Sequence, residues 1–199
     1  MSPSDRARAR FGRADLLFAD PVPRHPRLDG LTEIGRGEYS VVLDMGDGAR
    51  VMKVVSSPAD YFLYTADDRP QGPHFPVVFA DHGVIGRASN GYLLHLIEME
   101  RLHPIAAHTP AAQAANALMD AYWAGCRKWA ALGPEMGRVA LFNLTEAPPA
   151  GVAGSVLDAL RALSDFIDAY QVRPDLLSEG NLMMRGDGTL VFSDPVFLC

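Results

Sequence analysis

The stretch Gly180-NLMMRGDGTLVFSDPV-Phe197 decides how this chain is interpreted. Apolar runs stand on both sides of Gly186-Asp187-Gly188, a typical turn sequence, so the stretch predicts a strand, a tight turn and a second strand. Asn181 precedes the first strand, and Asp194 follows the second strand thirteen residues later. An aspartate enclosed by apolar residues and a proline indicates a function beyond packing.

Composition limits the classes of protein that the chain can belong to. The 199 residues are 48% hydrophobic and 21% charged, which predicts a globular protein with one domain or two small lobes. No apolar run approaches the roughly 18 residues that a membrane span requires, so we expect no membrane partner. A net charge of −6 argues against a nucleic-acid partner. Cys126 and Cys199 lack a paired spacing, which favours a reducing compartment, and we expect the cytoplasm.

The order of patterns predicts an α+β fold. Residues 1–30 are a basic and proline-rich arm and connector. Residues 31–103 contain short β-type runs with turn signals between them, which predict a five-stranded antiparallel sheet, and a short helix within 57–69. In residues 104–199, apolar residues repeat at helical spacing in 111–132 and 155–170. The second part is therefore expected to hold two helices and the hairpin.

Two features of the predicted sheet could bind phosphate. Gly35 and Gly37 lie where a backbone that turns between two strands can approach phosphate oxygens closely, although a glycine-rich turn also has purely structural uses. Lys53 stands in an apolar strand eleven residues after Val42. Because burying an ammonium group is costly, this lysine must either extend to solvent or meet an anion.

The order of these pieces along the chain carries a resemblance. A glycine-rich loop, a strand lysine, a loop from Asp175 to Asn181 and the hairpin aspartate Asp194 follow one another. This order resembles that of the protein-kinase-like phosphotransferases, over roughly residues 31–199. With its aspartate-proline pair and short C-terminal part, the chain looks like the small kinase-like proteins of bacteriophages and some bacterial effectors.

The resemblance implies a minimal two-lobed kinase-like fold and roles for individual residues. Asn181 and Asp194 would be the oxygen ligands of Mg²⁺. Lys53 would contact the α- and β-phosphates of ATP, and Asp175 would accept the proton of the attacking hydroxyl.

The resemblance also implies an adenine site. Val42 and Val51 match its roof, Met183 matches its floor, and Ile97 resembles a gatekeeper residue. The residues that resemble the hinge are Glu98, Met99 and Glu100, whose main-chain groups would recognise adenine.

The chain departs from the kinase pattern in the loop residues. Ser40 stands in place of the third glycine, and Arg173 in place of the usual histidine. Asp175 lies six residues before Asn181, where kinases have five, so Glu179 is a rival for the acidic role.

Two further departures concern the lysine's partner and the C-terminus. No glutamate occurs between Lys53 and the expected fourth strand, so Asp60, Asp67 and Asp68 are the acids available to pair with the lysine, or they cap and solvate a helix end. Five residues follow Asp194, which leaves no room for an activation segment.

The sequence therefore leaves three candidate functions. The first is an ATP- and Mg²⁺-dependent Ser/Thr protein kinase acting on a protein hydroxyl, with a host protein as one potential substrate. The second is a pseudokinase, a nucleotide-binding interaction module that grips a partner protein without efficient catalysis. The third is a small-molecule phosphotransferase, for which the C-terminal part is too short.

Overall fold

The computed structural model describes residue 18 and residues 20–176 and 180–198 of the chain. These residues form two compact units. The sheet unit contains the described residues of 13–67 together with Val77–Arg101, and the helical unit contains Asp68–Pro76 together with the described residues of 102–199. The fold is α+β, as expected from the sequence.

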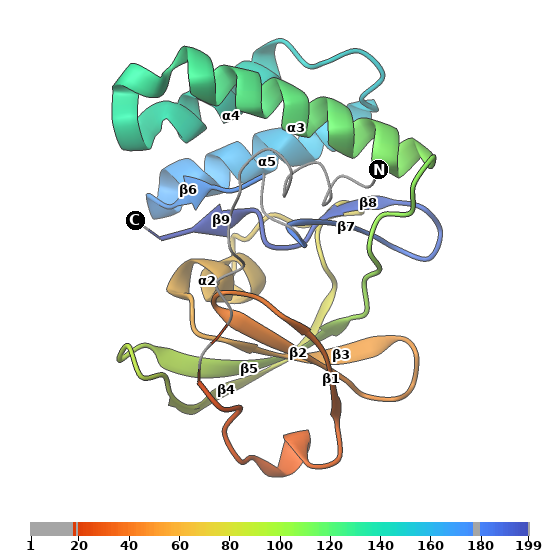
Figure 1. Cartoon of the computed structure of the whole chain (residues 1–199), viewed down its shortest axis with the longest axis vertical. Coiled ribbons are helices and arrows are strands. Elements are labelled where there is room, and N and C mark those ends of the chain that lie inside the picture. Colours follow the sequence, from red (N-terminus) through yellow and green to blue (C-terminus); the bar gives the residue numbers. More distant parts are fainter. Residues whose placement is uncertain (1–17, 19, 177–179, 199) are drawn as a thin grey trace. The chain divides into compact units, whose positions relative to one another are not determined.

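The sheet unit contains the antiparallel five-stranded sheet that the sequence predicts (Figure 1). Its order is β1-β2-β3-β5-β4, so β3 and β5 are central and β1 and β4 are edge strands. The strands are β1 (Thr32–Arg36), β2 (Ser40–Asp44), β3 (Arg50–Val55), β4 (Val78–Arg87) and β5 (Leu93–Glu100).

One face of this sheet carries an apolar core. Side chains alternate between faces along a strand, and the alternate residues Val41, Leu43, Met52, Val54, Leu94 and Leu96 cluster here with Ala88. Phe18 and Leu28, the latter from a 3₁₀ turn at Pro26–Leu28, complete the cluster. The expected connector before the first strand therefore covers one face of the sheet.

The opposite face of the sheet meets helix α2 (Pro58–Thr65), within the predicted range. The Ser57 side chain accepts a hydrogen bond from the Asp60 amide, and Pro58 occupies the first turn, so the helix begins where the sequence indicates. The ring of Tyr61 stacks on that of His95 of β5, with centroids 3.7 Å apart.

The helical unit contains helices α3 (Pro110–Lys128), α4 (Met136–Glu146) and α5 (Gly154–Tyr170), with a 3₁₀ segment at Ala130–Glu135. The expectation of two helices was wrong, because α4 was missed. This helix is short and follows Gly133-Pro134, which obscured its apolar face of Ala140, Leu141 and Leu144. A side chain at Gly125 of α3 would come within 2.8 Å of the Ala140 Cβ, so a glycine is needed where these helices meet.

Four short strands lie in the helical unit. Strands β7 (Leu182–Met184) and β8 (Leu190–Phe192) form the predicted hairpin, with Met183 opposite Val191. Strands β6 (Arg173–Pro174) and β9 (Val196–Phe197), which the sequence did not indicate, pair antiparallel. None of the helices in the described ranges is long and apolar enough to cross a membrane.

The core on the first face of the sheet predicts a large difference between two leucines of β5. Leu96 is fully buried and Leu93 is 39% exposed. Leu96→Ala is expected to lower the free energy of unfolding by roughly 2–5 kcal/mol, because it leaves a cavity. Leu93→Ala, the matched control, is expected to change it by less than about 0.5 kcal/mol. Urea denaturation measures both, and equal effects would contradict the assigned burial.

Candidate functional site

The residues predicted to bind nucleotide in the sheet unit form a row across its strands. Gly35 lies opposite Val42, Val42 opposite Lys53, and Lys53 opposite Ile97. Directly opposed residues of antiparallel strands place their side chains on the same face. Four residues that are separated along the chain therefore share one line on the face that α2 contacts.

Val51 lies on this same face, two residues before Lys53, and is opposite Met99. Both side chains are buried, with 4% and 3% of their surface exposed. The predicted apolar roof and the residues following the gatekeeper are thus neighbours in the sheet. Their contact with adenine stays a prediction.

The expected hinge residues Glu98, Met99 and Glu100 belong to β5, a central strand with neighbours on both sides. Glu98 lies opposite Met52 on one side and Ala80 on the other. The Glu100 amide donates to the Val77 carbonyl, and the strand ends there. The main-chain groups of these residues consequently take part in the sheet ladders, and their recognition of adenine stays a prediction.

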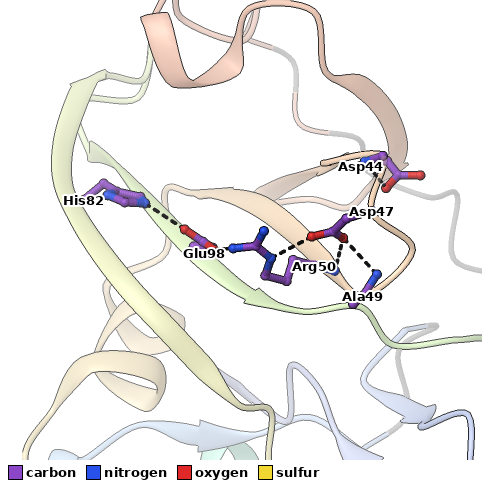
Figure 2. Close-up of polar contacts among 7 residues, drawn as sticks. Asp44, Asp47, Ala49, Arg50, His82 and Glu98 are labelled. Atoms are coloured by element: carbon purple, nitrogen blue, oxygen red, sulfur yellow. Dashed lines mark hydrogen bonds and ion pairs between the residues drawn. The ribbon is translucent and has the colours of Figure 1, made fainter.

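The Glu98 side chain lies on the face opposite to Lys53, in a polar chain that Figure 2 shows. Its carboxylate accepts a hydrogen bond from Arg50 at 2.7 Å and lies 3.5 Å from His82 Nε2. Arg50 also bonds Asp47 of the β2–β3 turn at 2.7 Å. Two amides and the Arg50 guanidinium hold the pKa of Asp47 at about 2. The Glu98 carboxylate of β5 therefore contacts Arg50 of β3 and His82 of β4, and so connects three strands of the sheet.

The glycine-rich segment forms the β1–β2 hairpin. The Gly37 amide donates to the Ser40 carbonyl at 2.9 Å, and Ser40 begins β2. At the loop tip, the hydrogen bond with Glu38, together with burial and the nearby carboxylate charge, raises the pKa of Tyr39 to about 12. A tyrosine hydroxyl is neutral near pH 7 even at its ordinary pKa, so this shift does not change the charge of the loop.

Lys53 is buried, with 3% of its surface exposed, so its side chain does not extend to bulk solvent within the sheet unit. Its Nζ donates a hydrogen bond to the Tyr64 hydroxyl of α2 at 2.7 Å and lies 4.8 Å from the centre of the Tyr64 ring. Sequence reasoning missed Tyr64, because it searched for an acidic partner only. The helical spacing of Tyr64 four residues after Asp60 was the available signal.

The three acids considered as partners of the lysine lie in different surroundings. Asp60 is 5% exposed and stands one turn before Tyr64 on the buried face of α2. Asp67 and Asp68 are exposed and follow the helix. Asp68 accepts a hydrogen bond from Tyr170 of α5. By position, Asp60 is the acid on the helix face that carries Tyr64.

In the helical unit, Asn181 and Asp194 lie at the same end of the β7–β8 hairpin. The Ser193 amide donates to the Asn181 carbonyl at 2.8 Å, which extends the ladder by one pair beyond Leu182 and Phe192. Asp194 is the next residue. The thirteen-residue spacing therefore corresponds to a closed hairpin, as predicted.

Asp175 joins this end of the hairpin through two hydrogen bonds. Its amide donates to the Pro195 carbonyl at 2.7 Å, and its carbonyl accepts from Asn181 Nδ2 at 2.8 Å. A carbonyl only accepts, so it fixes the orientation of the Asn181 amide and directs Nδ2, not Oδ1, to the loop. The structure thus brings together the two predicted Mg²⁺ ligands, Asn181 and Asp194, and the main chain of Asp175, which was predicted to accept the proton of the attacking hydroxyl.

The strand pair β6–β9 explains why Asp175 is adjacent to Asp194. Arg173 lies opposite Phe197, and Pro174 lies opposite Val196. The buried Tyr122 of α3 donates to the Pro174 carbonyl at 2.9 Å, and burial raises the pKa of Tyr122. Glu179, the rival acid, falls outside the described residues.

The donor set at the hairpin suits Mg²⁺ chemically. Among the described residues, no group of three or more His, Cys, Asp and Glu side chains could hold a metal ion by itself. Mg²⁺ in phosphoryl-transfer sites is usually held by one or two carboxylates together with substrate phosphates, so an all-protein cage is not required. One amide oxygen and one carboxylate, on Asn181 and Asp194, fit that mode of binding.

The chain matches no model of a protein family, and no curated protein sequence matches it. The assignment of function therefore depends on the geometry within each unit.

The contact between Lys53 and Tyr64 generates a prediction. Tyr64→Phe removes the acceptor of a hydrogen bond to a charged group, so we expect the free energy of unfolding to fall by about 1.5–3 kcal/mol. Tyr92→Phe is the matched control, because Tyr92 is 42% exposed. Chemical denaturation compares the two variants. A Tyr64→Phe protein as stable as the control would show that the hydroxyl does not support the lysine.

Proposed function

We propose that this chain is an ATP- and Mg²⁺-dependent phosphotransferase that transfers the γ-phosphate to a serine or threonine hydroxyl of a protein. The observation that carries the proposal is the arrangement of Asp175, Asn181 and Asp194 around the open end of one hairpin. Phosphoryl transfer depends mainly on positioning and on neutralising phosphate charge. Two carboxylates and one side-chain amide can position the attacking hydroxyl and, through a bound cation, neutralise phosphate charge.

The role of each hairpin residue follows from its environment. Asn181 is held by the Asp175 carbonyl through its amide nitrogen, so its Oδ1 is the atom that would bind a cation. Asp194, between buried Ser193 and Pro195, would provide the carboxylate. Asp175 would accept the proton of the attacking hydroxyl. Bound Mg²⁺ would offset the charge that develops on the phosphates.

The row of residues on the sheet supports nucleotide binding. Lys53 holds its amine in a buried strand position beside the Tyr64 hydroxyl, and this amine would contact the α- and β-phosphates. Val42, Val51 and Ile97 would contact adenine from the same face, and Met183 of β7 would contact it from the hairpin.

The two loop glycines are also compatible with a ligand. Neither Gly35 nor Gly37 has the positive φ that favours glycine. A side chain added at either position would meet its nearest described neighbours only at 3.8 Å, which is ordinary contact. The described residues thus leave room at both glycines, which is compatible with close approach of phosphate oxygens to the backbone.

We infer that the two units correspond to the lobes of a minimal kinase-like fold. This arrangement is part of the proposal. It is supported by the five-stranded sheet with its helix in one unit and by the helices with their hairpin in the other.

A pseudokinase is the second candidate, and two observations favour it. Arg173 occupies the place of the usual histidine, and no glutamate occurs between Lys53 and the fourth strand. Incubation with labelled ATP, Mg²⁺ and bacterial lysate separates the candidates. Label on a protein supports the enzyme, whereas nucleotide-dependent thermal stabilisation without transfer supports the pseudokinase. The absence of both label and stabilisation would contradict both candidates.

The metal assignment predicts different effects for two aspartates of the hairpin. Asp194→Ala should abolish Mg²⁺-dependent ATP binding or turnover, because it removes the proposed carboxylate ligand. Asp187→Ala, in the exposed turn of the same hairpin, should leave both nearly unchanged. Calorimetric titration with ATP and Mg²⁺, followed by a turnover assay, measures the difference. Normal turnover in Asp194→Ala would rule out the metal assignment.

The phosphate-binding role of Lys53 predicts that function falls more than stability. Lys53→Met should lower turnover by about 10²-fold or more, the usual effect of losing one charge-stabilising group, with a smaller effect on the melting temperature. Lys128→Met is the matched control, because Lys128 is exposed on α3. A large loss of melting temperature with normal specific activity of the folded fraction would count against the role of Lys53.

A further inference from the structure

A buried histidine outside the candidate site is attached to the hairpin that carries Asn181 and Asp194. His74 lies in the segment Pro73–Phe75, between α2 and β4 along the chain, and only 7% of its surface is exposed. This segment belongs to the same compact unit as the hairpin and α5. None of the roles assigned above uses it.

His74 makes three hydrogen bonds that connect two elements. Its main-chain carbonyl accepts from the Phe192 amide of β8 at 2.9 Å, and its Nδ1 lies 2.7 Å from the Leu190 carbonyl of the same strand. Its Nε2 lies 2.9 Å from the Ser155 hydroxyl in the first turn of α5. The Leu190 carbonyl only accepts, so Nδ1 carries a proton and, in the neutral ring, Nε2 accepts from Ser155.

These bonds occupy the edge of β8 that faces away from β7. In an antiparallel strand, residues two apart direct their main-chain groups to the same edge. Leu190 and Phe192 are two apart, and His74 satisfies a carbonyl of one and an amide of the other. A single residue therefore acts as a third strand for the hairpin.

Neighbouring residues hold the same segment against the hairpin. Arg185, at the end of β7, donates to the carbonyls of Pro73 and Phe75. The ring of Phe75 is buried and lies 5.9 Å from the ring of Phe192. Phe192 precedes Asp194 by two residues, so the contacts of the segment end close to the proposed metal ligand.

We propose that His74 is a positioning residue for the metal site: by fastening β8 to the first turn of α5, it sets the position of Asp194 and thereby the affinity for Mg²⁺. This inference rests on the proposed function. Groups that orient a metal ligand typically change metal affinity 10–100-fold when mutated. His74 acts through Phe192 and Leu190 and does not itself bind the ion.

Two substitutions separate the contacts of His74. The amide nitrogen of asparagine can replace Nδ1, so His74→Asn is expected to retain the bond to Leu190 and to lose the bond to Ser155. Glutamine reaches the position of Nε2, so His74→Gln is expected to do the reverse. His103→Asn is the control, because His103 borders the opposite edge of the hairpin through main-chain bonds with Met184 while its side chain is exposed.

The experiment titrates Mg²⁺ at fixed ATP with the full chain and measures the half-saturating Mg²⁺ concentration for nucleotide binding. His74→Gln and His74→Asn should each raise it, by up to about 10-fold, because each breaks one of the two side-chain bonds that join β8 to α5, and His103→Asn should leave it at the wild-type value. Hydrogen exchange of the Phe192 amide should be faster in His74→Gln. The affinity for ATP without Mg²⁺ should not change, whereas a general loss of structure would lower that affinity as well.

Each other outcome is decisive. An unchanged Mg²⁺ requirement in the folded His74→Gln and His74→Asn proteins would overturn the role of His74 while the proposed function stands. Wild-type protein that binds no ATP with Mg²⁺ would overturn both. Should His74→Gln fail to fold, Ser155→Ala at the exposed start of α5 replaces it: a higher Mg²⁺ requirement supports the proposal, and an unchanged one overturns it.

Discussion

The hydrogen bond from the Ser193 amide to the Asn181 carbonyl is the constraint on which the candidate site depends. It closes the open end of the β7–β8 hairpin and makes Asp194 a neighbour of Asn181. The bonds of Asp175 to Pro195 and Asn181 then attach the preceding loop to the same place. Because these are largely main-chain bonds, the backbone positions of the three candidate residues follow from the hairpin geometry, and the Asn181 side chain is held in addition by its bond to the Asp175 carbonyl.

The sheet unit applies a different constraint, the burial of a lysine. Lys53 occupies a central strand between apolar neighbours, and its Nζ donates a hydrogen bond to the Tyr64 hydroxyl on α2. A buried lysine held in this way suits the proposed contact with nucleotide phosphates, and it equally allows a module that binds nucleotide without turnover.

Local sequence patterns predicted most of the helices and strands, but they could not predict contacts between segments that are far apart in the chain. The five strands, α2 and the hairpin follow from turn residues, a helix cap and periodicity. Helix α4 was missed because its apolar face is short and follows Gly133-Pro134. Tyr64 was missed because only acidic partners of Lys53 were considered, whereas the contact of His74 with Leu190 could not be identified, because it joins segments far apart in the chain. The contact of Glu98 with Arg50 likewise depends on the register of β5 with β3.

A crystal structure with Mn²⁺ and a non-hydrolysable ATP analogue tests the central claim most directly, because anomalous scattering locates the metal. The account predicts a metal ion bonded to Asn181 Oδ1 and to the Asp194 carboxylate, with the Lys53 Nζ against the α- and β-phosphates of the same nucleotide. A metal bound elsewhere, or a nucleotide whose phosphates lie far from Lys53, would contradict it.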